Sequence, residues 1–187
     1  METDELRDLL QRLHLESDEA LRKRFDRSLP FQDGIFDRWE RARRLGFGDR
    51  ASIYESSLVF GDVRVGVDTW VGPFTILDGS GGRLAIGAFC SISSGVHVYT
   101  HDTVAWAISR GQRAKRAGPV TVGDCCYIGP QSVVVAGVTV GERCVIGANS
   151  FVSRDVPSGT VVAGSPARRI GRVVGEGADA TIEIDPS

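Results

Sequence analysis

The sequence predicts an all-β solenoid, a parallel β-helix in which short strands stack coil on coil. The main observation is a six-residue grid of branched aliphatic side chains with two register breaks. Glycine often follows a grid residue, and a small or β-branched residue recurs four positions after it. This period and chemistry are typical of coils around an apolar axis. The grid comprises Val59, Val65, Val71, Leu77, Ile86, Ile92, Val98, Val122, Ile128, Val134, Val140, Ile146 and Val152.

Each hexad is expected to hold one short strand and one glycine-assisted corner. Three hexads make a coil with three flat faces, so residues 59–157 give about five coils, stacked about 4.8 Å apart. The first break, between Leu77 and Ile86, is absorbed by the glycine-rich turn 79–82. The second break, between Val98 and Val122, requires an extruded loop, which we expect at residues 103–118.

One interior column is predicted to contain Thr69, Cys90, Cys126 and Cys144, because the grid places all four where a small buried side chain is needed. Packing is the favoured interpretation of these cysteines, since a free cysteine behaves as a small apolar residue. Stacked coils would bring the cysteines within disulfide range, but a cytosolic location disfavours the bond. Cys125 points away from the axis, and no CxxC spacing occurs, so no metal site is predicted.

The N-terminal segment 1–50 is predicted to be helical. Residues 3–14 have leucines at helical spacing, Ser17 can cap a second helix, and residues 35–45 suggest a third that stops at Gly46. The end of a solenoid exposes strand edges, so we expect these helices to cover the first coil. The alternative is that they wall part of a substrate site.

The β-helix domain is predicted to span residues 51–172, followed by an acidic tail at residues 173–187. Within the tail, Thr181–Ile184 either pairs as a short strand or stays loose. The net charge of −2 gives no general attraction to nucleic acid or anionic membrane. The N-terminus does not resemble a signal peptide and no apolar run is long enough to span a bilayer, so a cytoplasmic protein is expected.

Three histidines are the first candidates for chemistry. His14 falls in the predicted helices, where a solvated position is expected. His97 precedes an inward grid residue and should point outward, which most often means simple solvation. His101 falls at a corner where the extruded loop departs, and a histidine beside a long loop on a rigid scaffold suits general-base catalysis at neutral pH.

The stretch from Ile86 to Ile170 resembles the hexapeptide-repeat acyltransferases, in particular the galactoside, maltose and surface-sugar acetyltransferases. The closing segment Ala163–Arg168, of the AGSPAR type, is its most specific part. The other matching segments are 92–102, 119–124, 127–130, 137–141 and 145–150.

The resemblance implies a left-handed coil and a homotrimer with active sites in clefts between neighbouring subunits. It also implies acetyl-CoA as the donor, without a metal. The acceptor would be a sugar hydroxyl or the amine of a nucleotide-linked amino sugar. His101 matches the catalytic histidine of the family, with Asp102 or a nearby carbonyl fixing its tautomer. His97, Asp102 and Trp106 are the candidates for acceptor binding.

Five positions match cofactor contacts of the family. Ala148 matches a position whose backbone contacts the cofactor. Ser153 and Arg154 match a Thr-Lys pair near the pantetheine and phosphates. Arg168 matches a basic residue that binds the nucleotide phosphates. Tyr127 stands where several members have Trp. As a further departure, the chain has proline at position 130 where galactoside-type enzymes have serine, which removes one donor to the cofactor arm.

The predicted loop is also basic, with Arg110, Arg113, Lys115 and Arg116. These side chains either are simply solvated or bind phosphate, on CoA or on a nucleotide-linked acceptor.

Two other classes of protein fit parts of the pattern. A gamma-type carbonic anhydrase needs a third histidine, and none occurs between Phe60 and Val96. If the protein is a non-catalytic β-helix used for assembly, no acceptor should cause release of free thiol and His101 should be dispensable for its role.

Overall fold

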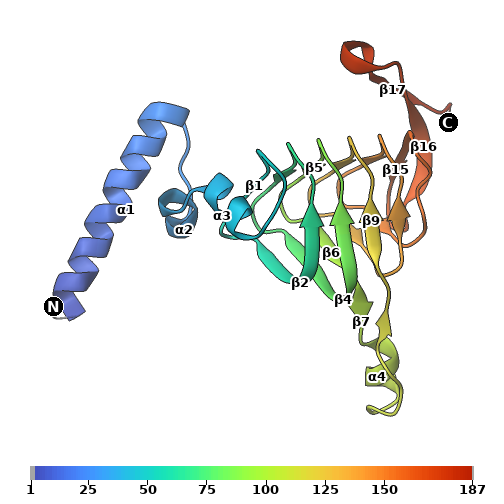
Figure 1. Cartoon of the computed structure of the whole chain (residues 1–187), viewed down its shortest axis with the longest axis horizontal. Coiled ribbons are helices and arrows are strands. Elements are labelled where there is room, and N and C mark those ends of the chain that lie inside the picture. Colours follow the sequence, from blue (N-terminus) through green and yellow to red (C-terminus); the bar gives the residue numbers. More distant parts are fainter. Residues whose placement is uncertain (1–2, 187) are drawn as a thin grey trace.

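The computed structural model describes residues 3–186, and Figure 1 shows its arrangement. A body of short strands occupies the middle of the molecule. A long helix, α1 (Thr3–Phe25), lies at one end, and a strand hairpin, β16 (Arg168–Val174) with β17 (Thr181–Ile184), lies at the other. A separate projection carries the short helix α4 (Val104–Ile108).

The strand body is formed by three columns of parallel strands, which we name the first, second and third faces. The first face consists of β1 (Ser52–Ile53), β3 (Trp70–Val71), β5 (Ser91–Ile92), β10 (Tyr127–Ile128), β13 (Val145–Ile146) and β15 (Thr160–Ala163). Strands β2 (Leu58–Val65) and β4 (Ile76–Ile86) are long enough to contribute to both other faces. The second face adds β6 (His97–Tyr99), β11 (Val133–Val134) and β14 (Phe151–Val152). The third face adds β9 (Val120–Val122), β12 (Thr139–Val140) and a bridge to Val156.

The grid residues line the interior, as predicted. Every one of them is buried except Val59, which is partly buried against the same core. Their strands are in register: Tyr127 pairs with Val145, 18 residues further along, and Ile128 pairs with Ile146. Most strands contain only two or three residues, so the stability of each depends on the apolar core, at about 1.5–3 kcal/mol per fully buried aliphatic side chain.

The predicted interior column is confirmed. Thr69, Cys90, Cys126 and Cys144 are all buried. The Thr69 hydroxyl accepts a hydrogen bond from the Cys90 N–H at 3.0 Å, and the Cys126 sulfur accepts one from the Cys144 N–H at 3.4 Å. Cys125 is exposed, as expected for a side chain that points away from the axis.

The N-terminal helices differ from the prediction in two ways. A single helix, α1, replaces the first two, and Ser17 lies inside it, where its hydroxyl donates to the Gly34 carbonyl at 2.8 Å instead of capping a helix. The predicted third helix is divided into α2 (Phe31–Ile35) and α3 (Arg38–Arg44). The division occurs because the Asp37 carboxylate accepts from the first N–H groups of α3 and so starts a new helix.

Only part of this segment covers the strand body. Helix α3 packs against β1, and the Arg41 guanidinium donates to the carbonyls of Tyr54 and Ser57. Helix α1 packs on α2 and buries none of its residues, so the prediction that it covers the first coil is wrong. No helix among residues 3–186 is long and apolar enough to cross a membrane.

The extruded loop is present where the sequence predicts it. Its two ends pair as antiparallel strands, β7 (His101–Asp102) and β8 (Arg116–Ala117), with α4 between them. The tail takes the strand alternative: β17 pairs antiparallel with β16, which itself pairs with β15 and runs across the boundary expected at 172/173. A 3-10 turn at Gly177–Asp179 connects β16 to β17.

Candidate functional site

His101 is held by a carboxylate from the preceding strand of the second face. Its Nδ1 lies 3.0 Å from the Oδ2 of Asp78, whose side chain is only 6% exposed, whereas that of His101 is 25% exposed. A proton on Nδ1, shared with Asp78, leaves Nε2 without a proton and able to accept one. This arrangement of carboxylate and imidazole is that of an oriented general base.

The surroundings of Asp78 hold the carboxylate in place. Its Oδ1 accepts hydrogen bonds from both the N–H and the hydroxyl of Ser80, at 2.9 and 2.6 Å. The buried Thr100 donates its hydroxyl to the Asp78 carbonyl at 2.8 Å and accepts from the Gly81 N–H at 2.9 Å. The glycine-rich turn is thereby fastened to the residue that precedes His101.

Glycine is required at position 81. A Cβ there would lie 2.4 Å from the Thr100 carbonyl oxygen and 2.5 Å from the Cβ of His101, which is closer than folded proteins allow. The four-residue turn at 79–82 therefore does more than absorb a three-residue register break, because it brings the Asp78 carboxylate beside His101.

His97 lies on the second face, half-buried and pointing outward, as expected. Its ring stands edge-on to Tyr99 with 5.8 Å between ring centroids, and the Tyr99 hydroxyl lies 3.4 Å from its Nδ1. Burial raises the pKa of Tyr99 and the charge of Asp78 adds to the effect, so the phenol keeps its proton near neutral pH. His97 and His101 thus have different partners.

Asp102 does not fix the tautomer of His101. Its Oδ1 accepts a hydrogen bond from the N–H of Val104, the first residue of α4, at 3.0 Å. The expectation that Asp102 or a carbonyl orients the imidazole is wrong, because Asp78 occupies that place. Sequence reasoning missed Asp78, although two signals were available: its position just after the inward Leu77, and the glycine-rich turn that follows it.

The predicted cofactor residues are divided between two parts of the strand body. Tyr127 points outward from the first face, where it is paired with Ser91 and Val145. Ala148 is exposed at the turn after β13. The structure therefore does not gather Tyr127 with the residues that follow the second face.

Ser153 and Arg154 are exposed immediately after β14, on the same side of the second face as His101. Strands β6, β11 and β14 pair in that order, so β6 and β14 are two strand spacings apart, about 10 Å. Arg168 reaches the same region, since the Ala167 N–H donates to the Phe151 carbonyl at 2.8 Å. Among residues 3–186, neither arginine has a carboxylate partner, so both can bind phosphate.

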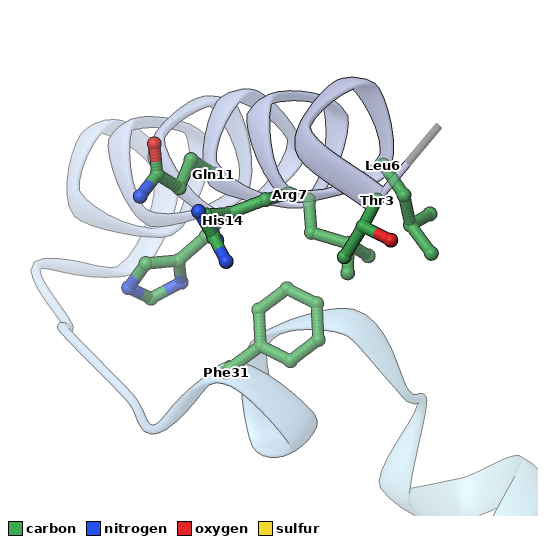
Figure 2. A pocket seen from close by; sticks show the side chains of 7 residues that line it. Thr3, Leu6, Arg7, Gln11, His14 and Phe31 are labelled. Atoms are coloured by element: carbon green, nitrogen blue, oxygen red, sulfur yellow. The ribbon is translucent and has the colours of Figure 1, made fainter. Parts of the chain in front are cut away.

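A hollow lies far from His101, between α1 and α2 (Figure 2). It measures about 530 Å³, and Figure 2 shows Phe31 facing His14 and Leu6 across it. The rings of His14 and Phe31 stand edge-on, 5.6 Å apart, so His14 is half-buried here and not fully solvated. Within the part of the chain that the structure describes, no carboxylate or cysteine lines this hollow, so it offers no acid–base pair comparable with Asp78 and His101.

The protein thus has curled, mostly parallel sheets, and the histidine–carboxylate pair beside the second face offers a candidate general base. The family model for the bacterial transferase hexapeptide, six repeats, matches residues 119–154. Residues 119–154 of this chain therefore carry the hexapeptide repeat of that family.

Two solved structures illustrate the likeness. The hexapeptide-repeat acetyltransferase VCA0836 from Vibrio cholerae, in complex with acetyl coenzyme A, is 27% identical with a TM-score of 0.62; the match covers 90% of this chain and 87% of that one. A point mutant of AntD, an N-acyltransferase from Bacillus cereus, in complex with dTDP and coenzyme A, is 21% identical with a TM-score of 0.60; the match covers 71% of this chain and 88% of that one. The likeness to AntD is one of fold.

Proposed function

We propose that the protein is an acetyl-CoA-dependent acyltransferase that transfers an acetyl group to a sugar hydroxyl or to the amine of a nucleotide-linked amino sugar. The observation that carries the proposal is the 3.0 Å contact between His101 Nδ1 and the buried Asp78 carboxylate. The acetyl coenzyme A bound to VCA0836 and the dTDP and coenzyme A bound to AntD support the choice of donor and acceptor class.

The transfer can be carried out by one base that a carboxylate orients. His101 Nε2 accepts the proton of the acceptor hydroxyl or amine while the acceptor atom bonds to the thioester carbon. Asp78 stabilises the imidazolium that results, because its negative charge lies beside the Nδ1 proton. The carbon–sulfur bond then breaks, and the imidazolium returns the proton to the departing thiolate. No covalent enzyme intermediate is required.

The exposed side chains of the strand body fit the donor. Arg154 and Arg168 supply cations for the phosphates, and Ser153 and the Ala148 backbone supply hydrogen bonds nearby. Tyr127 supplies an aromatic surface for the pantetheine arm. Tyr127 lies on the first face, away from His101 of the same subunit. We therefore assign it to a donor groove between two subunits, in which the first face of one subunit contacts the second face of its neighbour.

We further propose a homotrimer of left-handed β-helices, each of about five coils, in the cytoplasm. The outward side chains of the second face form a registered, largely apolar column: Leu58, Ile76, His97, Val133 and Phe151. Two side chains of this column are exposed to solvent, Leu58 to 49% and Phe151 to 39%. A second copy against this face would bury the column and place His101, at the edge of the face just after β6, in a cleft between subunits.

The direct test is a screen of sugars and nucleotide sugars for release of free CoA thiol from acetyl-CoA, followed by mass spectrometry of the products. The proposal predicts an acceptor that gains one acetyl group and a stoichiometric amount of thiol. A protein that binds acetyl-CoA but transfers its acetyl group to no sugar in the screen would contradict the proposal and favour a role in assembly.

A further inference from the structure

The extruded loop concentrates positive charge. Between Asp102 and Asp124 the chain has no acidic residue, and Arg110, Arg113, Lys115 and Arg116 fall within this interval. The loop is exposed along nearly its whole length and projects from the strand body (Figure 1). A local excess of four cations in a chain whose net charge is −2 indicates an anionic ligand.

The loop cations have no carboxylate to neutralise them. Nine arginines elsewhere form ion pairs: Arg7, Arg22, Arg41, Arg44, Arg50, Arg64, Arg83, Arg169 and Arg172. Among residues 3–186, no carboxylate lies within ion-pair distance of Arg110, Arg113 or Lys115. Arg116 is engaged differently, since its guanidinium donates to the Ala136 carbonyl at 3.1 Å and fastens the base of the loop to the strand body. Three cations are therefore available to bind a ligand.

An aromatic ring accompanies these cations. Trp106, in α4, is 54% exposed, and the Gly111 N–H donates to its carbonyl at 2.8 Å, which closes a turn. The indole lies over this turn, so that a Cβ on Gly111 would be 3.4 Å from its Nε1. The indole thus lies over the backbone between Arg110 and Arg113. An exposed aromatic ring among unpaired cations is the combination that binds a nucleobase and its phosphates.

The loop is attached beside the candidate base. His101 pairs with Ala117 and Asp102 pairs with Arg116, so both ends of the loop meet at His101. Trp106 is five residues from His101, and a fully extended chain of that length spans at most about 18 Å. A ligand that extends from the loop to His101 would present its far end to the base.

We infer that the loop at residues 103–118 binds the nucleoside diphosphate part of a nucleotide-linked sugar acceptor. Trp106 stacks on the base, and Arg110, Arg113 and Lys115 bind the diphosphate. This inference rests on the proposed function and narrows its acceptor to the nucleotide-linked class, with the sugar presented to His101.

The test uses uridine diphosphate and thymidine diphosphate as probes, with titration calorimetry on the full chain. The triple variant Arg110→Gln, Arg113→Gln and Lys115→Gln removes three cations. The matched control, Arg22→Gln, Lys23→Gln and Arg24→Gln, removes the same number and kind of cations from the exposed end of α1. CoA is titrated into all three proteins, because CoA also carries phosphates.

The inference predicts that the loop variant binds a nucleoside diphosphate about ten- to a hundred-fold more weakly than the wild type, with CoA affinity unchanged. Trp106→Leu should weaken nucleoside diphosphate binding by roughly five- to a hundred-fold while leaving the affinity for inorganic pyrophosphate unchanged. The control variant should match the wild type in every titration. Added salt should weaken wild-type binding more than binding by the loop variant.

Any of three results would overturn the inference: a wild type that binds neither nucleoside diphosphate, a loop variant that loses affinity for CoA instead, or a loop variant whose assembly has a different mass in light scattering. If plain sugars are acetylated while neither diphosphate binds, the inference is wrong and the proposed function stands. If a diphosphate binds through the loop but no acceptor releases thiol, the proposed function is wrong and the nucleotide site stands.

Discussion

The second and third faces of the strand body are built partly from the same strands, β2 and β4, yet they present different surfaces. Their inward residues are equivalent, since Leu77 on one and Ile86 on the other are both buried aliphatic side chains. Their outward residues are not. The second face presents a largely apolar column, and His101 lies at its edge, just after β6. The outward column of the third face is Arg64, Ala85, Thr121 and Thr139.

The comparison shows that the inward and the outward positions of the same repeat follow different requirements. The inward positions repeat because every coil needs the same apolar core, whichever face it serves. The outward positions need not repeat for the core to form. The apolar column and the histidine–carboxylate pair on the second face therefore meet a requirement separate from that of the core. Substitutions on the second face should therefore affect activity and assembly, and equivalent substitutions on the third face should not.

The largest expected effect is that of His101→Ala. Loss of a well-placed general base typically costs on the order of a hundred- to ten-thousand-fold in rate. The fold, the assembly and CoA binding should persist, because the side chain lies at a corner outside the apolar core. Turnover is measured on the acceptor found by screening, with Thr121→Ala on the third face as the control. Near-normal turnover of His101→Ala would show that the base lies elsewhere.

Asp78→Asn should have the next largest effect. The amide keeps the size of the side chain and can still accept from Ser80, but it cannot stabilise the imidazolium, so we expect a loss of roughly a hundred-fold or more in kcat. Its KM for acetyl-CoA should not change. Asp68→Asn is the matched control, since the Asp68 carboxylate is paired with Arg50 and has no contact with His101. Equal losses in the two variants would contradict a special role for Asp78.

Phe151→Asp tests the second face as an interface. A carboxylate in the middle of a buried apolar contact is unfavourable, so the variant should lose the assembly at low protein concentration and most of its turnover with it. Light scattering measures the mass. Thr139→Asp on the third face should keep the wild-type mass, and a monomeric wild type that remains active would rule out a shared cleft.

Arg168→Ala should have a smaller effect, confined to the donor. Loss of one charge-assisted hydrogen bond to phosphate should raise the KM for acetyl-CoA about tenfold with kcat little changed. Its neighbour is a suitable control, because Arg169 is paired with Asp185 at 3.1 Å and Arg169→Ala should leave the KM unchanged. Identical CoA affinity in calorimetry for Arg168→Ala and the wild type would remove Arg168 from the site.

His97→Ala should have the smallest effect of the five. His97 has a different partner from His101 and lies on the face itself, so its loss should raise the KM for the acceptor a few-fold and leave kcat nearly intact. A loss of kcat as large as that of His101→Ala would mean that the two histidines act together.

The sequence predicted the strand body well because its inward residues repeat: twelve of the thirteen grid residues are buried, and Val59 is partly so. It predicted His101 from its corner position and from a family resemblance. It did not predict Asp78, because the contact joins residues 23 positions apart through a turn whose geometry depends on Gly81. It also misplaced α1, whose leucines have the spacing of a packed helix but stay 40–48% exposed at positions 6, 9, 10 and 13.

The most direct test of the central claim, that the edge of the second face carries a histidine–carboxylate pair acting as one base, is the turnover of the double variant His101→Ala with Asp78→Asn. Residues that act as a unit show strongly non-additive losses. The structure predicts that the double variant turns over at the same rate as His101→Ala, within about twofold, since Asp78 has no function without the imidazole. A double variant whose loss equals the product of the two single losses would contradict the pair.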